Sequence, residues 1–120
     1  MKVHEYQAKK FFASYGLPVD RNIICRTPDE AVEAYKQLGI EKAVVKAQVH
    51  TGGRGKAGGV KLGSNEAEIR QHAEAILGMD IKGFIVDRVL VSEAVDIASE
   101  YYMSILVDRK SKCPMLMLSR

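Results

Sequence analysis

The chain has 120 residues, enough for one domain with a modest hydrophobic core. A hydrophobic content of 47% and a charged content of 28% are typical of a soluble globular protein and exclude a disordered chain. A net charge of +3 is too small to indicate a dedicated nucleic-acid-binding protein. No apolar run reaches the ~20 residues of a membrane span and no secretory signal is recognisable, so we expect a cytoplasmic protein without membrane contact.

Apolar periodicity and capping residues predict three helices. The first covers residues 4–16 (HEYQAKKFFASYG), has a broad apolar face and ends at a glycine. The second begins at Thr27, which is followed by Pro and then by Glu three residues after the cap, and it ends at Gly39. The third begins at Asn65 and ends at Gly78.

Short apolar runs bounded by turn residues predict the strands. They cover residues 22–26, 43–49, 89–91, 101–107 and 115–118. A further strand-like run follows the glycines at residues 58–62. Because helices and strands occur in mixed order, the predicted fold class is α+β, a mixed sheet with flanking helices.

The most unusual segment is KAQVHTGGRGKAGGVKLG, residues 46–63, which holds six of the ten glycines. Five cations and no carboxylate occur between Lys42 and Asn65. Such a local excess of positive charge favours an anionic ligand. Plain alternatives are a flexible loop for the glycines and an ordinary strand lysine for Lys46.

Residues 53–60 match the letters G-x-G-x-x-G-x-V, but their context excludes the known classes of phosphate-binding loop with similar motifs. A strand-like run follows where a Rossmann motif requires a helix. Gly55-Lys56 is followed by Ala57 instead of the Ser or Thr of a Walker A loop. The strand lysine and catalytic loop that a protein kinase has after its glycine loop are missing. No aromatic residue interrupts residues 49–62, which argues against an RGG-type nucleic-acid segment.

A glycine hairpin between two strands remains. Glycines allow the backbone to approach an anion closely, and backbone N–H groups can then surround phosphate oxygens together with Lys and Arg side chains. Lys46 lies on the strand that enters the hairpin, so we expect its ammonium group to be held in place. The segment is therefore predicted to bind phosphate.

Four blocks of the sequence are distinctive: HEYQAK (4–9), GLP (16–18), VVKxQVH (44–50) and GGRGKAGGV (52–60). Shorter blocks continue in order with DI (96–97), ExY (100–102) and VDR (107–109). In these blocks the chain resembles the N-terminus of the β subunit of succinyl-CoA synthetase. The resemblance implies that residues 1–120 are the first part of an ATP-grasp nucleotide-binding domain, with the rest of that domain and a CoA-ligase domain missing.

The activity that the resemblance implies is a succinate–CoA ligase of the tricarboxylic acid cycle. It uses ATP or GTP and CoA, and it passes through a phosphohistidine on a partner α subunit. The implied Mg²⁺ ligands lie outside this chain, so we expect neither a catalytic residue nor a metal site within it, and no activity from it alone. His50 is expected to shape the glycine loop or bind phosphate, and His72 to be solvated on its helix.

The resemblance also implies the nucleotide-binding residues. Lys46 would contact a phosphate, and Gly53, Arg54 and Gly55 would form a loop covering the phosphates. Ser92 and Val95 would meet the adenine through backbone atoms, although relatives often have Glu at the first of these positions. Glu100 would receive the ribose hydroxyls, a role that its two acceptor oxygens suit.

Two other functions stay open. A related ATP-grasp ligase, such as a malate–CoA ligase or an enzyme of the ATP-citrate lyase type, would have the same residues here, since the acid is selected elsewhere. A small basic nucleic-acid-binding module is the alternative from another class. The two cysteines, Cys25 and Cys113, lack metal-ligand spacing and are expected to be buried or half-buried free thiols.

Overall fold

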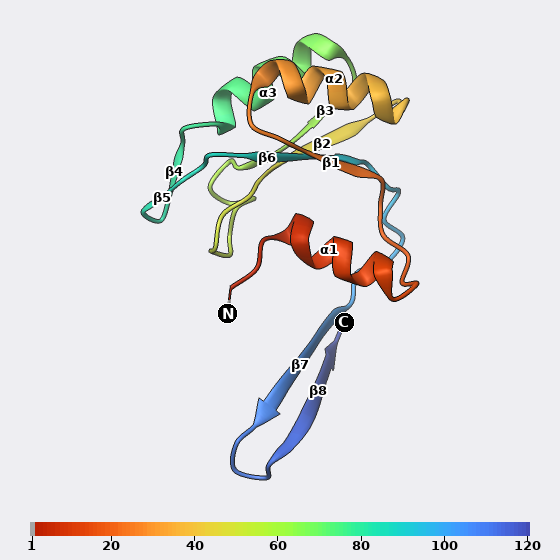
Figure 1. Ribbon diagram of the computed structural model, residues 1–120, viewed down its shortest axis with the longest axis vertical. Coiled ribbons are helices and arrows are strands. Elements are labelled where there is room, and N and C mark those ends of the chain that lie inside the picture. The colour runs from red at the N-terminus through yellow and green to blue at the C-terminus, as the bar shows by residue number, and fades with distance from the viewer. Residues whose placement is uncertain (1) are drawn as a thin grey trace.

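The computed structural model describes residues 2–120 and contains three helices and eight strands in this range. A four-stranded sheet forms its centre, and every neighbouring pair in it is antiparallel (Figure 1). In spatial order its strands are β1 (Asn22–Cys25), β6 (Val89–Glu93), β2 (Ala43–Ala47) and β3 (Val60–Gly63). The predicted α+β class is confirmed.

The helix boundaries follow from their capping residues. In α2 (Pro28–Leu38) the Thr27 hydroxyl accepts the Glu30 backbone N–H at 3.1 Å, and Gly39 ends the helix with a φ of 60°. In α3 (Glu66–Ile76) the Asn65 side chain accepts the Glu68 N–H at 2.9 Å. Both predicted helix starts are confirmed, and α3 ends two residues before the predicted Gly78.

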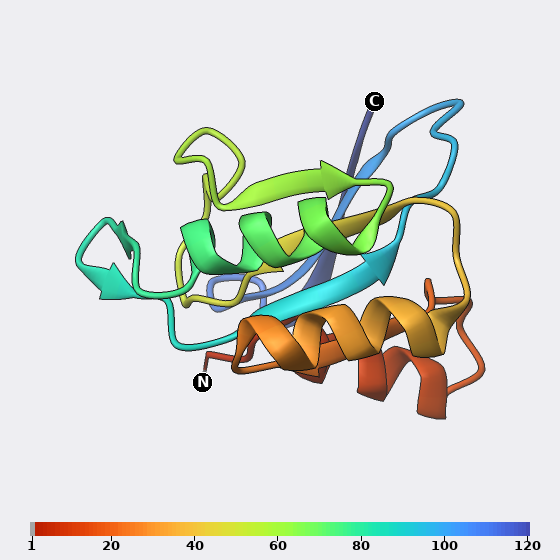
Figure 2. The same ribbon diagram turned by 90° about the horizontal axis from the view of Figure 1, so that it is seen from above.

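The hydrophobic core lies between the sheet and the two helices α2 and α3, which run side by side over one face (Figure 2). Strand β2 alternates strictly, so that Ala43, Val45 and Ala47 are fully buried in this core. Helix α3 contributes Ile69, Ala73 and Ile76, each with no exposed surface. The alternating residues of the strand and the residues on one face of the helix therefore pack into the same apolar layer.

Helix α1 (Glu5–Ser14) lies against the opposite face of the sheet (Figure 1). The helix is confirmed, but it buries none of its residues, and Phe11 and Tyr15 on its apolar face are 62% and 84% exposed. Polar contacts connect α1 to the remainder instead. The Tyr6 backbone N–H donates to Gln48 Oε1 at 3.2 Å, and Lys9 pairs with Asp20 at 2.6 Å.

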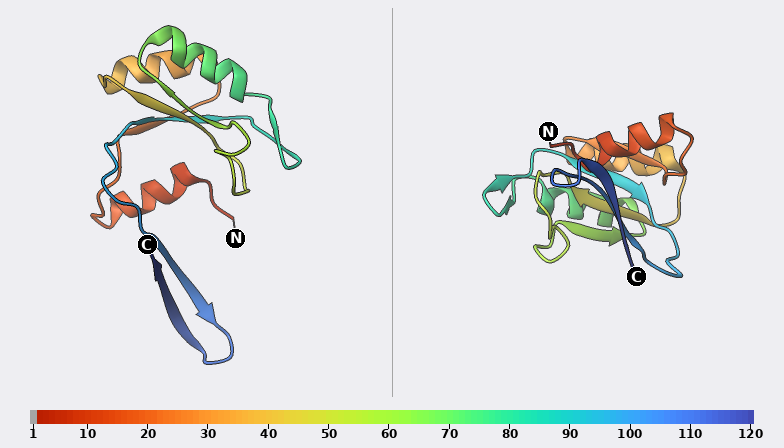
Figure 3. Two further views of the ribbon diagram at one scale, coloured as in Figure 1. Left: turned by 180° about the vertical axis from the view of Figure 1, so that it is seen from behind. Right: turned by 90° about the horizontal axis from the view of Figure 1, so that it is seen from below.

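Two hairpins lie outside the sheet. One consists of β4 (Asp80–Ile81) and β5 (Phe84–Ile85), which the sequence analysis did not anticipate. The other, β7 (Tyr102–Asp108) with β8 (Cys113–Ser119), projects away from the sheet beyond α1 (Figure 3). Every residue of β8 is exposed, so the prediction of a buried or half-buried Cys113 is wrong, whereas Cys25 is buried as expected.

None of the helices in residues 2–120 has the length and apolar character required to cross a bilayer.

Candidate functional site

The glycine loop, residues 48–59, connects β2 to β3 as predicted. Lys46 lies opposite Val60 in the antiparallel pair, and the Ala47 N–H donates to the Gly59 carbonyl at 2.7 Å. A Cβ atom at Gly59 would lie 2.8 Å from Ile81 Cδ1, 3.1 Å from Ala47 Cβ and 3.2 Å from the Arg54 carbonyl, so the close packing at this point favours glycine. The loop therefore leaves the sheet from a fixed base.

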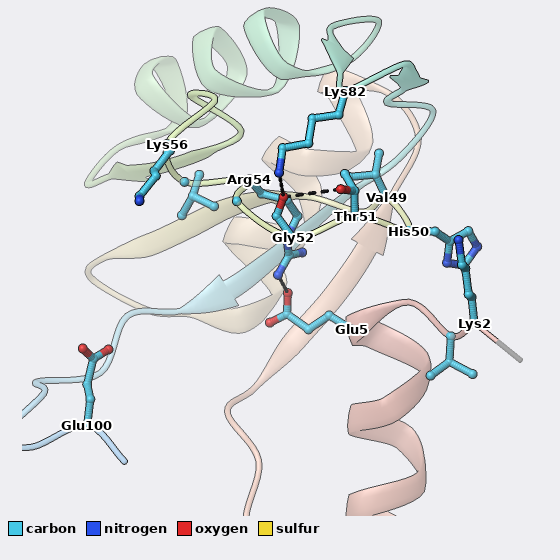
Figure 4. Close-up of a pocket in the computed structure, with 14 residues that line it drawn as sticks. Lys2, Glu5, Val49, His50, Thr51, Gly52, Arg54, Lys56, Lys82 and Glu100 are labelled. Atoms are coloured by element: carbon cyan, nitrogen blue, oxygen red, sulfur yellow. Dashed lines mark hydrogen bonds and ion pairs between the residues drawn. The ribbon is translucent and has the colours of Figure 1, made fainter. Parts of the chain in front are cut away.

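An open groove of about 1260 Å³ lies beside this loop (Figure 4). Residues of the glycine loop form one wall, the first residues of the chain contribute to another, and Glu100 lies on the side away from His50. Four cations and two carboxylates line it: Lys2, Arg54, Lys56, Lys82, Glu5 and Glu100. The excess of positive charge makes this groove suitable for an anionic ligand.

Glu5 organises the cations next to the groove. Its carboxylate lies 2.8 Å from the Arg54 guanidinium and 3.4 Å from Lys46 Nζ, and Arg54 also donates to the Ala47 carbonyl at 2.7 Å. Burial raises the pKa of Glu5, but Lys46, Arg54 and Lys9 outweigh that effect and bring it to about 2. The carboxylate is therefore ionised at neutral pH and fixes the direction of the Arg54 side chain.

Lys46 occupies the predicted strand position but does not itself line the groove. Its ammonium group pairs with Glu5 and, at 3.8 Å, with Asp20. It is connected to Arg54 through the shared Glu5 carboxylate. Lys46 thus belongs to the same charged cluster as the glycine loop.

The predicted nucleotide-binding residues fall into two groups in space. Gly53, Arg54, Gly55 and Glu100 all line the groove. Ser92 is fully buried inside the sheet, opposite Asn22 and Val44, and its hydroxyl has no partner among the described residues. Val95 is 63% exposed beyond the end of β6 and, like Ser92, does not line the groove. The adenine-side assignment stays a prediction.

The histidines differ in their surroundings. The rings of His4 and His50 stack with centroids 3.9 Å apart, at the base of the glycine loop. The pKa of His4 is lowered, first by burial and then by the neighbouring His50 and Arg88. His72 is half-buried and its Nε2 lies 2.9 Å from the Leu62 carbonyl, so its ring is only partly solvated. It bridges α3 to β3.

Among the charged residues of the groove, sequence reasoning missed Lys2, Glu5 and Lys82. Glu5 belongs to the HEYQAK block, but its contact with Arg54 joins residues far apart in the chain, and no local sequence pattern predicts such a contact. Lys82 lies in the turn of the β4–β5 hairpin. The letters I-K-G-F place a glycine before an apolar residue, but Lys-Gly is not among the dipeptides that usually mark a two-residue hairpin turn.

The described residues contain no group of three or more His, Cys, Asp or Glu side chains placed to hold a metal ion. The chemistry that these residues offer is the binding of an anion.

Comparison with known proteins identifies the family. Residues 2–120 match the model of the ATP-grasp domain. The chain is 58% identical over 99% of its length to the succinate–CoA ligase [ADP-forming] β subunit of Bacteroides thetaiotaomicron, and 53% identical over its whole length to the GDP-forming β subunit of Thermus thermophilus. It spans about a third of each of these relatives, 32%.

A solved structure is similar as well. It is a dinucleotide-forming acetyl-coenzyme A synthetase 1 of Candidatus Korarchaeum cryptofilum, in complex with coenzyme A and Ca-AMPCP, with a TM-score of 0.84 and 25% identity over 98% of this chain and 53% of that one. The sheet, the glycine loop and the match over residues 2–120 lead to one conclusion: the chain belongs to the ATP-grasp domain family.

Proposed function

We propose that this chain is the N-terminal part, residues 1–120, of the ATP-grasp domain of a succinate–CoA ligase β subunit. The observation that carries the proposal is the cationic glycine loop beside an open groove, in a chain 58% identical to such a subunit. Its task would be to hold the phosphates of ATP or GTP. Relatives named as ADP-forming and as GDP-forming are both similar to it.

The whole enzyme would interconvert succinate, CoA and a nucleoside triphosphate with succinyl-CoA, nucleoside diphosphate and phosphate. A phosphohistidine on a partner α subunit would carry the phosphoryl group. Mg²⁺ and CoA would be held by residues outside this chain. Mg²⁺, when bound, would neutralise charge on the phosphate oxygens.

Within the groove, the proposal gives each group a role that suits its chemistry. The backbone N–H groups of the glycine loop and the side chains of Arg54 and Lys56 would surround phosphate oxygens. Glu5 would keep the Arg54 guanidinium directed at the groove, because it holds that group at 2.8 Å. Lys46 would add charge beside Glu5. Glu100, across the groove, would accept the ribose hydroxyls.

A second candidate is a related acid–CoA ligase that uses another acid. The similarity to an acetyl-coenzyme A synthetase structure at a TM-score of 0.84 favours it as the alternative. The higher identity to succinate–CoA ligases favours succinate. Comparing succinate with acetate, malate and citrate as substrates of the full-length protein and its α partner would decide between the acids.

Calorimetric titration of ATP and GTP into the full-length protein tests nucleotide binding. Arg54→Ala should weaken binding about tenfold, since Arg54 lines the groove and loss of a charge-assisted contact costs about 1.5 kcal/mol. Glu100→Ala should weaken it less, because the groove leaves Glu100 exposed to water. Lys42→Ala is the matched control, an exposed lysine near the start of β2 that does not line the groove, and should bind as the wild type does. Equal affinity of all four proteins would contradict the assignment of these residues.

A further inference from the structure

The turn of the β4–β5 hairpin has an unusual conformation. Ile81 pairs with Phe84, so that Lys82 and Gly83 alone form the turn, with φ angles of 55° and 83°. Two-residue turns with positive φ at both positions favour Asn-Gly. A lysine in the left-handed region is disfavoured because its Cβ crowds the following carbonyl. The turn therefore holds a residue that its backbone does not favour.

The Lys82 side chain has a specific contact. Its Nζ donates to the Gly52 carbonyl of the glycine loop at 3.0 Å, across 30 positions of the chain (Figure 4). A Cβ atom on Gly53 would lie only 3.2 Å from the same Nζ, so the ammonium lies directly against two consecutive glycines of the loop. Lys82 is also one of the cations that line the groove.

The glycine loop depends on such outside contacts. Its internal bonds, Gly59 N–H to Arg54 O at 2.8 Å and Ala57 N–H to Gly53 O at 3.2 Å, join the residues from Gly53 onward. Among the described residues, contacts from other segments hold it as well: the His4 ring stacks on His50, Glu5 pairs with Arg54, and Lys82 donates to the Gly52 carbonyl. At Gly52, directly before these internal bonds begin, the side chain from outside the loop that donates to the backbone is Lys82.

We propose that Lys82 is a positioning residue of the groove. Its ammonium holds the Gly52 carbonyl and thereby keeps the loop's N–H groups and Arg54 arranged for the oxygens of a polyphosphate ligand. The inference rests on the proposed function for its ligand, but not for the contact that holds the loop.

Lys82→Asn separates this role from a merely structural one. Asn suits the left-handed turn, so the melting temperature of the full-length protein should stay the same or rise. Loss of the bond to Gly52 should nevertheless speed amide hydrogen exchange in residues 50–59 about fivefold without nucleotide, and weaken ATP binding by a similar factor. The expected result is an equal or higher melting temperature together with faster amide exchange in the loop and weaker ATP binding.

The chain offers a matched control. Lys112, in the turn of the β7–β8 hairpin, has a φ of 54° and does not line the groove. Lys112→Asn should change the melting temperature in the same direction and leave loop exchange and ATP affinity unchanged. Lys82→Arg should restore both to within about twofold, because a guanidinium can also donate to the Gly52 carbonyl.

Two results would overturn the inference: loop exchange in Lys82→Asn equal to that of the wild type, or equal acceleration in Lys112→Asn. Lys82→Gly, which also accepts a positive φ, guards against an effect peculiar to Asn and must loosen the loop too. Failure of the wild-type protein to bind ATP would instead contradict the proposed function. Loop exchange without nucleotide would still decide whether Lys82 holds the loop.

Discussion

The two faces of the central sheet are covered in different ways. On one face α2 and α3 bury apolar side chains, including Ala31, Ile69 and Ile76, against β2 and β6. On the other face α1 buries none of its residues. It is joined to the sheet by ion pairs and hydrogen bonds: Glu5 with Lys46 and Arg54, and Tyr6 with Gln48.

This difference assigns the two faces different roles: the apolar face stabilises the fold, and the charged face is suited to bind a ligand. Burial of apolar surface is non-directional and contributes about 25 cal/mol per Å², so the α2–α3 face supplies most of the folding free energy of the described region. Charged contacts near water contribute little and can be exchanged for contacts with a ligand. The groove lies on the charged side, where an incoming anion can compete for the same cations.

Thiol labelling should reveal the largest contrast. Cys25 in the apolar layer is 1% exposed, and burial together with Glu30 raises its pKa to about 12. Cys113 on the projecting hairpin is exposed. Because the thiolate is the reactive form and Cys25 reacts only after the layer opens, Cys113 should be alkylated at least a thousandfold faster. Mass spectrometry of peptides from the 120-residue chain over time measures both rates, and similar rates would show that the apolar layer opens readily.

Truncating one apolar side chain in each region should give the next largest contrast. Ile76→Ala, at a fully buried site, should lower the free energy of unfolding of this chain by about 2–5 kcal/mol. Leu118→Ala, at a site 69% exposed on β8, should change it by less than about 0.5 kcal/mol. Urea denaturation followed by circular dichroism measures both. A comparable loss in Leu118→Ala would mean that the hairpin is covered in solution.

The sequence predicts those parts of the structure that local interactions decide. Helix α2 follows from Thr27 and Gly39, and α3 from Asn65, because capping involves residues three or four apart. The hairpin of β2, glycine loop and β3 follows from a strand pattern on both sides of the glycines. Two of the groove's four cations, Arg54 and Lys56, belong to the segment in which the sequence has five cations and no carboxylate.

Contacts between segments far apart in the chain could not be predicted from local sequence patterns. The exposure of Phe11 on α1 depends on what lies beside that helix, whereas its periodicity alone suggests a buried face. The pairing of β1 with β6 brings residues about 70 positions apart together, and no local signal gives the strand order. Glu5 and Lys82 reach the glycine loop for the same reason, through the tertiary fold.

Glu5→Gln tests the charged face directly, and its difference from its control should be the smallest of the three contrasts. The side chain is 22% exposed, so its loss at pH 7 should cost about 1–2 kcal/mol of unfolding free energy after allowance for solvent screening. Because folding lowers the pKa of Glu5 from 4.5 to about 2, its contribution is complete above about pH 4.5 and disappears as the pH falls to about 2. Chemical denaturation at a series of pH values should therefore show two stability curves, for wild type and Glu5→Gln, that converge below pH 4.5.

Glu33→Gln, which removes an exposed pair with Lys36 on α2, is the control and should follow the wild type throughout. Curves for Glu5→Gln and wild type that coincide at neutral pH would mean that α1 is held to the sheet by something other than this carboxylate.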